Sequence, residues 1–189
     1  AGNDRLVGGN NRTVLREEAF AGDITVTSDG KAATVTGLGI DQLKGTFTTL
    51  ELLGGDGPNK IDASGFNFAV TLQGGGGDDT LIGGSASDSL DCGDGVDQIR
   101  QTVDLEQILT DTLVTGRGAD TLSSIEEAVL IGGPQGTNIN AEAFTGNVTL
   151  IGNGGNDTLI AGSGNDLLDG GDGNDKLFGL GGNDTADGA

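Results

Sequence analysis

Nine-residue repeats carry the residues that could do chemistry in this chain. Residues 152–187 hold four copies back to back, GNGGNDTLI, AGSGNDLLD, GGDGNDKLF and GLGGNDTAD. Each copy has glycine at several of its first four places, aspartate at its sixth place and an apolar residue at its eighth place. Ca²⁺ takes six to eight oxygen ligands and accepts backbone carbonyls beside carboxylates. Glycine-rich stretches that end in aspartate therefore indicate calcium binding.

The same repeats predict the elements that would position these ligands. Glycine tolerates positive φ, so the first six residues can form a sharp turn. The remaining three can form a short strand whose middle side chain points away from its neighbours. Two repeats then close one coil of a solenoid, and alternate turns lie on opposite edges. We therefore expect Asp157 to pair with Asp175, and Asp166 with Asp184, with one ion between each stacked pair of turns.

The composition favours a solenoid over a conventional core. Apolar residues make up 34% of the 189 residues and aromatic residues 3%, and Trp, Tyr, Met and His are absent from the sequence. A stacked solenoid needs only rows of small branched residues. The formal net charge of -20 excludes plain electrostatic binding to nucleic acid or anionic lipid and makes divalent cations the natural counter-charge.

Cysteine usage and hydropathy add little. Cys92 is the single cysteine, so an internal disulfide is excluded, and we interpret it as a small turn residue where sister repeats have glycine. No apolar run is long enough for direct membrane insertion, and no signal peptide is recognisable. The chain opens on the tail of a repeat with Asp4 in its sixth place, which is typical of a piece cut from a longer array.

A larger repeat contains the nine-residue one. Residues 74–100 form a second block, GGGGDDTLI, GGSASDSLD and CGDGVDQIR, and a shift of 78 residues places it on the C-terminal block. Between 54–82 and 132–160, 15 of 29 positions are identical, which indicates an internal duplication. We expect a degenerate first copy over 1–53, a module over 54–131 with calcium block 74–100 and spacer coils, and a second copy over 132–189 with calcium block 152–187.

The first copy and the spacers depart from the nine-residue pattern. In the first copy Ala33 stands where the next copy has Asp79, so that coil should keep its strand and lose its ion. Phe66 and Phe144 each fall where two extra residues enter a coil, which predicts plugs over widened coils, and Phe20 matches them in the first copy. Segments 101–114 and 122–131 have mixed periodicity, and the solenoid context favours strands. Weaker ligand candidates lie in the related stretches 35–43 and 114–122, at Asp41 and Asp120.

These repeats resemble the RTX family of calcium-binding proteins, and the strings NKIDASGF and NINAEAF resemble connecting segments of very large bacterial surface and secreted proteins. The resemblance implies an all-β fold, a right-handed parallel β-roll or β-helix solenoid with calcium-binding glycine-rich turns. It also implies folding on calcium binding and export into a calcium-rich exterior. The carboxylate ligands that it implies are Asp79, Asp88, Asp97, Asp157, Asp166, Asp175 and Asp184, with Asp4 at the truncated edge and Asp94 and Asp172 as further third-place oxygen donors. The carbonyl donors that it implies belong to Gly74, Gly76, Gly93, Gly95, Gly152, Gly154, Gly162, Gly164, Gly171, Gly173, Gly179 and Gly181.

Some positions depart from the family pattern. Ala86 replaces the fourth-place glycine of its repeat, and Ala186 is a weak core residue, so the turn at 83–88 and the last strand are the least certain elements. Asp88 has no sixth-place partner two repeats away, and Asp104 is the candidate that could replace one.

The sequence therefore predicts a calcium-binding structural segment of a secreted or cell-surface bacterial protein that binds several Ca²⁺ ions and is not an enzyme. One alternative is a calcium-dependent adhesin, surface-layer or matrix module that self-associates or binds other surface components. Another is an accessory module of a polysaccharide-active enzyme, because parallel solenoids also host such activities. The lack of His and the shortage of basic residues argue against a catalytic site.

Overall fold

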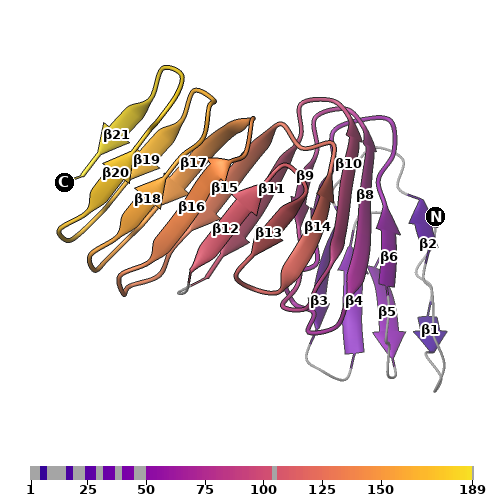
Figure 1. The fold of residues 1–189 in the computed structure, drawn as a ribbon. Helices are drawn as coiled ribbons and strands as arrows, with labels where there is room; N and C mark the ends of the chain where they lie inside the picture. The colour runs from indigo at the N-terminus through magenta and orange to yellow at the C-terminus, as the bar shows by residue number, and fades with distance from the viewer. Residues whose placement is uncertain are drawn as a thin grey trace. The chain divides into compact units, whose positions relative to one another are not determined.

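The structure is a computed structural model that describes residues 5–7, 16–18, 24–28, 32–36 and 40–44 as strands, and then residues 50–103 and 106–188. These described residues form strands and turns without a helix, as Figure 1 shows, so none of them forms a helix that could cross a membrane. The chain divides into two compact units, Ala1–Asp97 and Gln98–Ala189.

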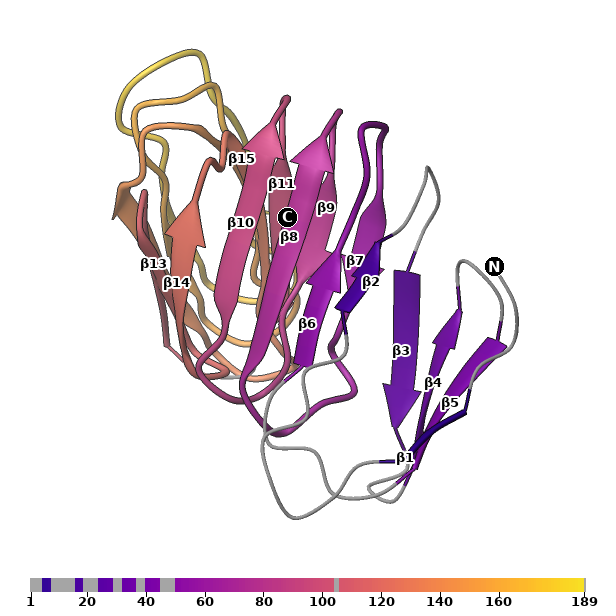
Figure 2. The same ribbon diagram turned by 90° about the vertical axis from the view of Figure 1, so that its right-hand side faces the viewer.

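The first unit has strands in two sheets, which face each other in Figure 2. One sheet has the order β1-β5-β4-β3-β7-β9 and the other the order β2-β6-β8-β10. The strands are β1 (Arg5–Val7), β2 (Arg16–Glu18), β3 (Ile24–Ser28), β4 (Ala32–Thr36), β5 (Ile40–Lys44), β6 (Leu50–Leu53), β7 (Lys60–Asp62), β8 (Val70–Gly76), β9 (Thr80–Ile82) and β10 (Ser89–Asp94).

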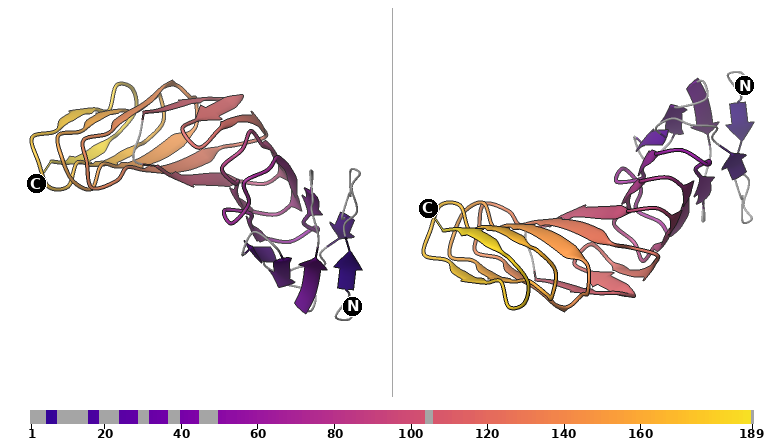
Figure 3. Two further views of the ribbon diagram at one scale, coloured as in Figure 1. Left: turned by 90° about the horizontal axis from the view of Figure 1, so that it is seen from below. Right: turned by 90° about the horizontal axis from the view of Figure 1, so that it is seen from above.

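The second unit repeats this arrangement. Its sheets have the orders β11-β15-β17-β19-β21 and β14-β13-β12-β16-β18-β20, and Figure 3 shows the chain passing from one sheet to the other through a turn at each edge. The strands are β11 (Gln98–Thr102), β12 (Gln107–Thr110), β13 (Leu113–Thr115), β14 (Ala119–Ser123), β15 (Glu127–Ile131), β16 (Asn138–Ala143), β17 (Asn147–Ile151), β18 (Thr158–Ile160), β19 (Leu167–Asp169), β20 (Lys176–Phe178) and β21 (Thr185–Asp187).

Parallel pairing between strands two repeats apart confirms the predicted solenoid. In the 18-residue coils Leu72 lies opposite Leu90, and Leu150 lies opposite Leu168. In the 20-residue coils Ile61 lies opposite Leu81, and Ile139 opposite Leu159. Because like positions face each other from coil to coil, one apolar residue per strand produces a continuous row of core side chains.

The eighth-place residues form this core. Leu81, Leu90, Ile99, Leu159 and Leu168 are each at most 3% exposed. Complete burial of such a side chain contributes about 1.5–3 kcal/mol, so these rows are a main source of stability in each coil. The last strand, β21, does form, but Ala186 in it is exposed. Cys92, interpreted from the sequence as a turn residue, is completely buried within β10, two residues before that strand ends.

The two phenylalanines plug the longer coils, as predicted. Phe66 and Phe144 are 3% and 1% exposed. Each ends a tight turn in which its N–H donates to the carbonyl of Ala63 or Ala141, at 3.0 and 2.9 Å. The third expected plug, Phe20, lies outside the described residues.

Two segments are antiparallel where parallel coils were expected. β4 pairs antiparallel with both β3 and β5, and β13 pairs antiparallel with both β12 and β14. Only residues 29–31 separate β3 from β4, and parallel neighbours need a crossover of about a dozen residues. The expectation of strands in 101–114 and 122–131 is confirmed. The strand expected over Ala33 also forms, as β4, and the expected loss of a calcium ion from that coil stays a prediction.

The hairpins also place the weaker ligand candidates. Asp120 lies inside β14, opposite Val114 of β13, and is only 2% exposed. It therefore belongs to a hairpin strand and not to a stacked glycine turn. Asp41 lies in β5, and its side chain is outside the described residues.

The turns stack so closely that some glycines cannot be replaced. Gly77 has φ of 98°, and a β-carbon on it would lie 2.7 Å from the carbonyl carbon of Gly57 in the preceding coil. The neighbouring Gly76 has no positive φ, and a β-carbon there would meet its nearest atom at 3.7 Å. The two glycines lie in the same turn, but they differ in backbone φ and in the room available for a β-carbon.

This difference gives a matched test of the turn. Gly77→Ala should lower the free energy of unfolding by about 1–3 kcal/mol, because alanine must adopt a left-handed backbone conformation against the next coil. Gly76→Ala should change it by less than about 1 kcal/mol. Denaturant unfolding at saturating calcium measures both variants, and equal stabilities would contradict the observed turn conformation.

Candidate metal sites

The sixth-place aspartates fold back over the first residue of their own repeat. A β-carbon on Gly170 would lie 2.5 Å from Oδ2 of Asp175, and Gly152 and Gly74 stand in the same relation to Asp157 and Asp79. The space above a first-place glycine is therefore the seat of a carboxylate. This explains why that place prefers a residue without a side chain.

One oxygen of each carboxylate binds the backbone of the preceding coil. The N–H of Asp157 donates to Oδ1 of Asp175 at 2.8 Å, and the N–H of Asp79 donates to Oδ1 of Asp97 at 2.7 Å. Asp157 in turn accepts from the N–H of Thr137 at 2.5 Å. The structure thus brings Asp157 and Asp175 into adjacent coils on one edge, as the two-repeat spacing predicts.

The second oxygen of several of these carboxylates is buried and unpaired. Oδ2 of Asp79, Asp157 and Asp175 accepts no hydrogen bond, and Asp79 and Asp157 are 2% and 1% exposed. A buried ionised oxygen without a partner is costly. A cation bound against these oxygens would remove that cost, so the donor set fits a calcium ion.

Burial also shifts the acidity of these groups. Burial raises the pKa of Asp79 to about 6, with a further upward contribution from the charge of Asp97 and a downward one from the Asn59 N–H. Burial raises the pKa of Asp157 as well, and the charge of Asp175 adds to it. Ionisation of these carboxylates is therefore less favourable in the folded chain than in the unfolded chain, and a nearby cation would favour it.

Oxygen atoms from the backbone must complete any such site. Among the described residues no group of three or more His, Cys, Asp or Glu side chains lies together in a way that could hold a metal. The glycine carbonyls predicted as donors belong to the turns that hold the sixth-place aspartates. One of them, the Gly162 carbonyl, accepts the N–H of Gly181 at 3.1 Å. Their role as calcium ligands stays a prediction.

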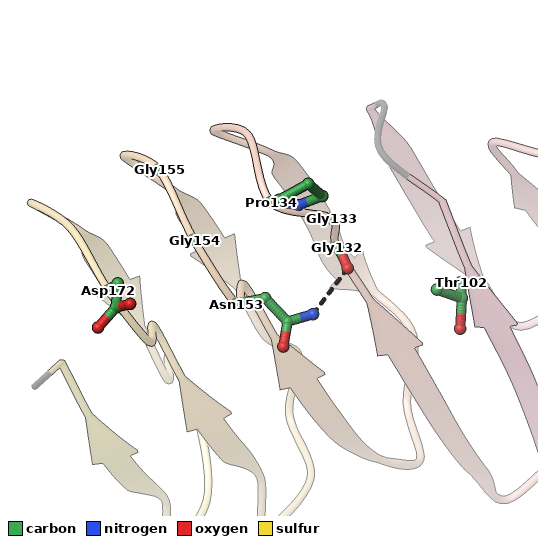
Figure 4. Close-up of a pocket in the computed structure, with 8 residues that line it drawn as sticks. All are labelled: Thr102, Gly132, Gly133, Pro134, Asn153, Gly154, Gly155 and Asp172. Carbon is green, nitrogen blue, oxygen red and sulfur yellow. Dashed lines mark hydrogen bonds between the residues drawn. The ribbon is translucent and has the colours of Figure 1, made fainter.

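The third-place aspartates lie outside the buried seat. Asp172 is exposed, and its backbone joins two coils because its N–H donates to Asn153 and its carbonyl accepts from Gly155, at 2.7 and 2.9 Å. Figure 4 shows its carboxylate at one side of a shallow hollow, where Asn153 donates its side-chain amide to the Gly132 carbonyl at 2.8 Å. The hollow is lined by Thr102, Gly132, Gly133, Pro134, Asn153, Gly154, Gly155 and Asp172. Asp94 is exposed in the corresponding place of the first unit.

Asp88 and Asp166 are held differently. Asp88 accepts the N–H of Val70 on Oδ1 at 2.8 Å and the N–H of Gly84, in its own turn, on Oδ2 at 2.6 Å. Asp166 accepts from Val148 at 2.8 Å and from Gly162 at 3.2 Å. Both carboxylates are buried, and burial raises the pKa of both while these N–H groups lower it. The turn at 83–88 therefore forms despite Ala86, through its aspartate.

The remaining candidates lie at the margins of the structure. Asp184 is exposed, and its Oδ1 accepts the N–H of Asp166 at 3.0 Å, which places the two in adjacent coils as expected. Asp4 and Asp104 lie outside the described residues, so the edge site and the proposed partner of Asp88 stay predictions.

A second ladder of side chains was not predicted from the sequence. Fifth-place Asn156 and Asn165 accept the N–H groups of Asn174 and Asn183, one coil further on, at 2.8 and 2.9 Å. Asp78 accepts from Val96 in the same way at 3.0 Å. This ladder runs in the opposite direction to that of the sixth-place aspartates. Asparagine at the fifth place of all four C-terminal repeats was the available signal.

The fold and its turns define a class of protein, the parallel β-solenoids with acidic, glycine-rich turns. Residues 71–99, 109–124 and 145–188 match the RTX calcium-binding nonapeptide repeat family in four copies. The chain therefore carries RTX calcium-binding repeats in a β-solenoid. The match over 109–124 falls on the hairpins of β12, β13 and β14, where the sequence offered only Asp120. No curated protein shows significant similarity to the chain.

The raised pKa values predict how the calcium-free fold responds to pH. The folded chain holds protons on Asp79 more tightly than the unfolded chain does, because its pKa moves from 3.8 to about 6. The stability from this protonation is fully present below the ordinary pKa and is lost as pH rises through about 6. In chelator, circular dichroism should show a larger folded fraction at about pH 5 than at about pH 7.5.

Calcium should remove this dependence, because the ion takes the place of the proton. Asp79→Asn should weaken the dependence in chelator, because the amide does not titrate. A calcium-free folded fraction that rises steadily from acid to neutral pH would contradict the assignment.

Proposed function

We propose that this chain is a calcium-dependent structural segment of a secreted or cell-surface bacterial protein, which folds when it meets calcium outside the cell. RTX repeats are typical of secreted bacterial proteins. The observation that carries the proposal is the buried, unpaired Oδ2 atom on Asp79, Asp157 and Asp175. A cation bound in the turn would compensate each of these atoms.

The charge of the chain supports folding that depends on calcium. A formal net charge of -20 opposes compaction. Extracellular calcium modules bind at about 10⁻⁴–10⁻³ M, a range that extracellular calcium fills and cytosolic calcium does not. Ions that bind the folded chain stabilise it by mass action, so binding free energy becomes folding free energy. The segment would stay open inside the cell and wind into a solenoid outside.

Self-association through calcium is the second candidate, and it is favoured by exposed apolar side chains in the last coils. Leu167, Phe178 and Leu180 are 44%, 46% and 59% exposed. Another copy of the chain or another surface component could cover them.

One titration tests the proposal and separates the two candidates. Far-UV circular dichroism should show a largely disordered chain in chelator at neutral pH and a β-rich spectrum at millimolar calcium. An ordered β spectrum that chelation leaves unchanged would overturn calcium-dependent folding. Light scattering during the same titration should stay at the monomer value for a structural segment and rise with calcium for a self-associating one.

Loss of a single ligand should weaken calcium binding at one place. Asp175→Asn keeps the acceptor for the Asp157 N–H and removes the buried negative oxygen, so calcium affinity at that site should fall by about tenfold or more. Asp169→Asn removes the same charge from an exposed position in β19 and should leave affinity within about twofold. Calorimetric titration measures both, and equal affinities in the two variants would remove Asp175 from the ligand set.

A further inference from the structure

The sixth-place aspartates occur in two kinds of turn. Open turns have positive φ at their second and fourth places, and they are 74–79, 92–97, 152–157, 170–175 and 179–184. Closed turns are 83–88 and 161–166, and no residue in either has positive φ. The first four of these stack as two open pairs, 74–79 with 92–97 and 152–157 with 170–175, because paired strands lie two repeats apart.

The closed turns satisfy their carboxylates from their own backbone. The second-place N–H groups of Gly84 and Gly162 point at Oδ2 of Asp88 and Asp166. Oδ1 of each accepts an N–H from the preceding coil, so both oxygens of each carboxylate are hydrogen-bonded. An N–H group that points at an oxygen places positive charge where a cation would otherwise bind.

The coil beneath imposes the closed conformation. Gly84 lies against the Phe66 carbonyl, which a β-carbon would approach to 2.6 Å, and Gly162 lies against Phe144 in the same way. The Ser85 N–H donates to the Phe66 carbonyl at 2.9 Å. The phenylalanine turns that widen these coils thus hold the next turn in the form whose glycine N–H reaches the aspartate.

In the open turns the second-place residue has left-handed φ, 109° at Gly75, 71° at Asn153 and 79° at Gly171. No N–H reaches Oδ2 of Asp79, Asp157 or Asp175 there. Turn 179–184 shares the left-handed φ at Leu180 and Gly182, but it stacks on the closed turn 161–166. Its pair is therefore incomplete.

We propose that calcium in the described part of this chain binds only between paired open turns, one ion between 74–79 and 92–97 and one between 152–157 and 170–175. In the closed turns Asp88 and Asp166 serve as metal-independent clamps, in which a backbone N–H does what the ion does elsewhere. Calcium then fastens one edge of each unit, and hydrogen bonds fasten the other. This inference rests on the proposed function, that the chain binds calcium.

Counting bound ions tests the inference. Native mass spectrometry of the full chain at saturating calcium, with circular dichroism to confirm the fold, gives the number of ions in wild type and variants. Asp79→Asn and Asp157→Asn should each hold one ion fewer than wild type. Asp88→Asn and Asp166→Asn should hold the wild-type number but unfold at a lower temperature, because the amide nitrogen that replaces Oδ2 cannot accept from the glycine N–H. A folded Asp88→Asn or Asp166→Asn chain that has lost an ion overturns the inference.

A second measurement needs no variant. Anomalous scattering from terbium in crystals of the wild-type chain should give peaks beside Asp157 and Asp79 and none beside Asp166 or Asp88. A peak beside either of the last two overturns the inference even if the substituted chains do not fold. A wild-type chain that binds no calcium at all is a separate outcome, because it removes the proposed function and leaves the hydrogen-bonded clamps as they are.

Discussion

The rest of the structure depends on one contact, the hydrogen bond from the backbone of one coil to the aspartate of the next. In the turns of the second unit, the N–H of Asp157 reaches Asp175 and the N–H of Asp166 reaches Asp184. This contact sets the spacing of the turns, so a side chain at some glycine positions would collide with the preceding coil. The asparagine ladder runs the other way, so two side chains per turn hold adjacent coils in register. The contact also buries the carboxylate and leaves its other oxygen in need of a partner.

The duplicated sequence is visible in the hydrogen bonds. Val70 donates to Asp88 and Val148 to Asp166, and Asn59 donates to Asp79 and Thr137 to Asp157, each pair offset by 78 residues. The change from Asn59 to Thr137 is tolerated because only the backbone N–H takes part. The boundary between the two compact units nevertheless falls between Asp97 and Gln98 in the sequence, and not at residue 54 or 132. Module boundaries at 54 and 132 therefore stay a hypothesis about the history of the sequence. A solenoid folds through contacts between adjacent coils, and these contacts do not depend on where one duplicated module ends and the next begins.

Between the two acidic blocks, buried glutamine amides hydrogen-bond the backbone of the second unit. Gln107 is fully buried, and its Nε2 donates to the Ile131 carbonyl at 3.2 Å, while Gln101 donates to the Thr115 carbonyl at 2.7 Å. These amides occupy the wider coil made by the β12, β13 and β14 hairpins, where a branched side chain would leave polar backbone unpaired. Coils with acidic glycine turns are thus separated along the chain by coils that bury glutamine amides.

The sequence by itself determined the parallel coils, the rows of leucine and isoleucine, the plugs at Phe66 and Phe144 and the pairing of aspartates in adjacent coils. The coils, the rows and the aspartate pairs follow from a nine-residue period, because the period fixes which side chain faces inward and which residues lie one coil apart. The plugs follow from the two extra residues that interrupt this period. Only the tertiary structure decided which carboxylates keep a free oxygen, where the chain reverses into antiparallel hairpins, and how the asparagines bind. Asp88 and Asp157 occupy the same place in their repeats, and they differ because the coil beneath fixes the φ of a neighbouring residue and thereby the direction of its N–H. A local pattern cannot encode that contact, since it is made by residues about 20 positions away.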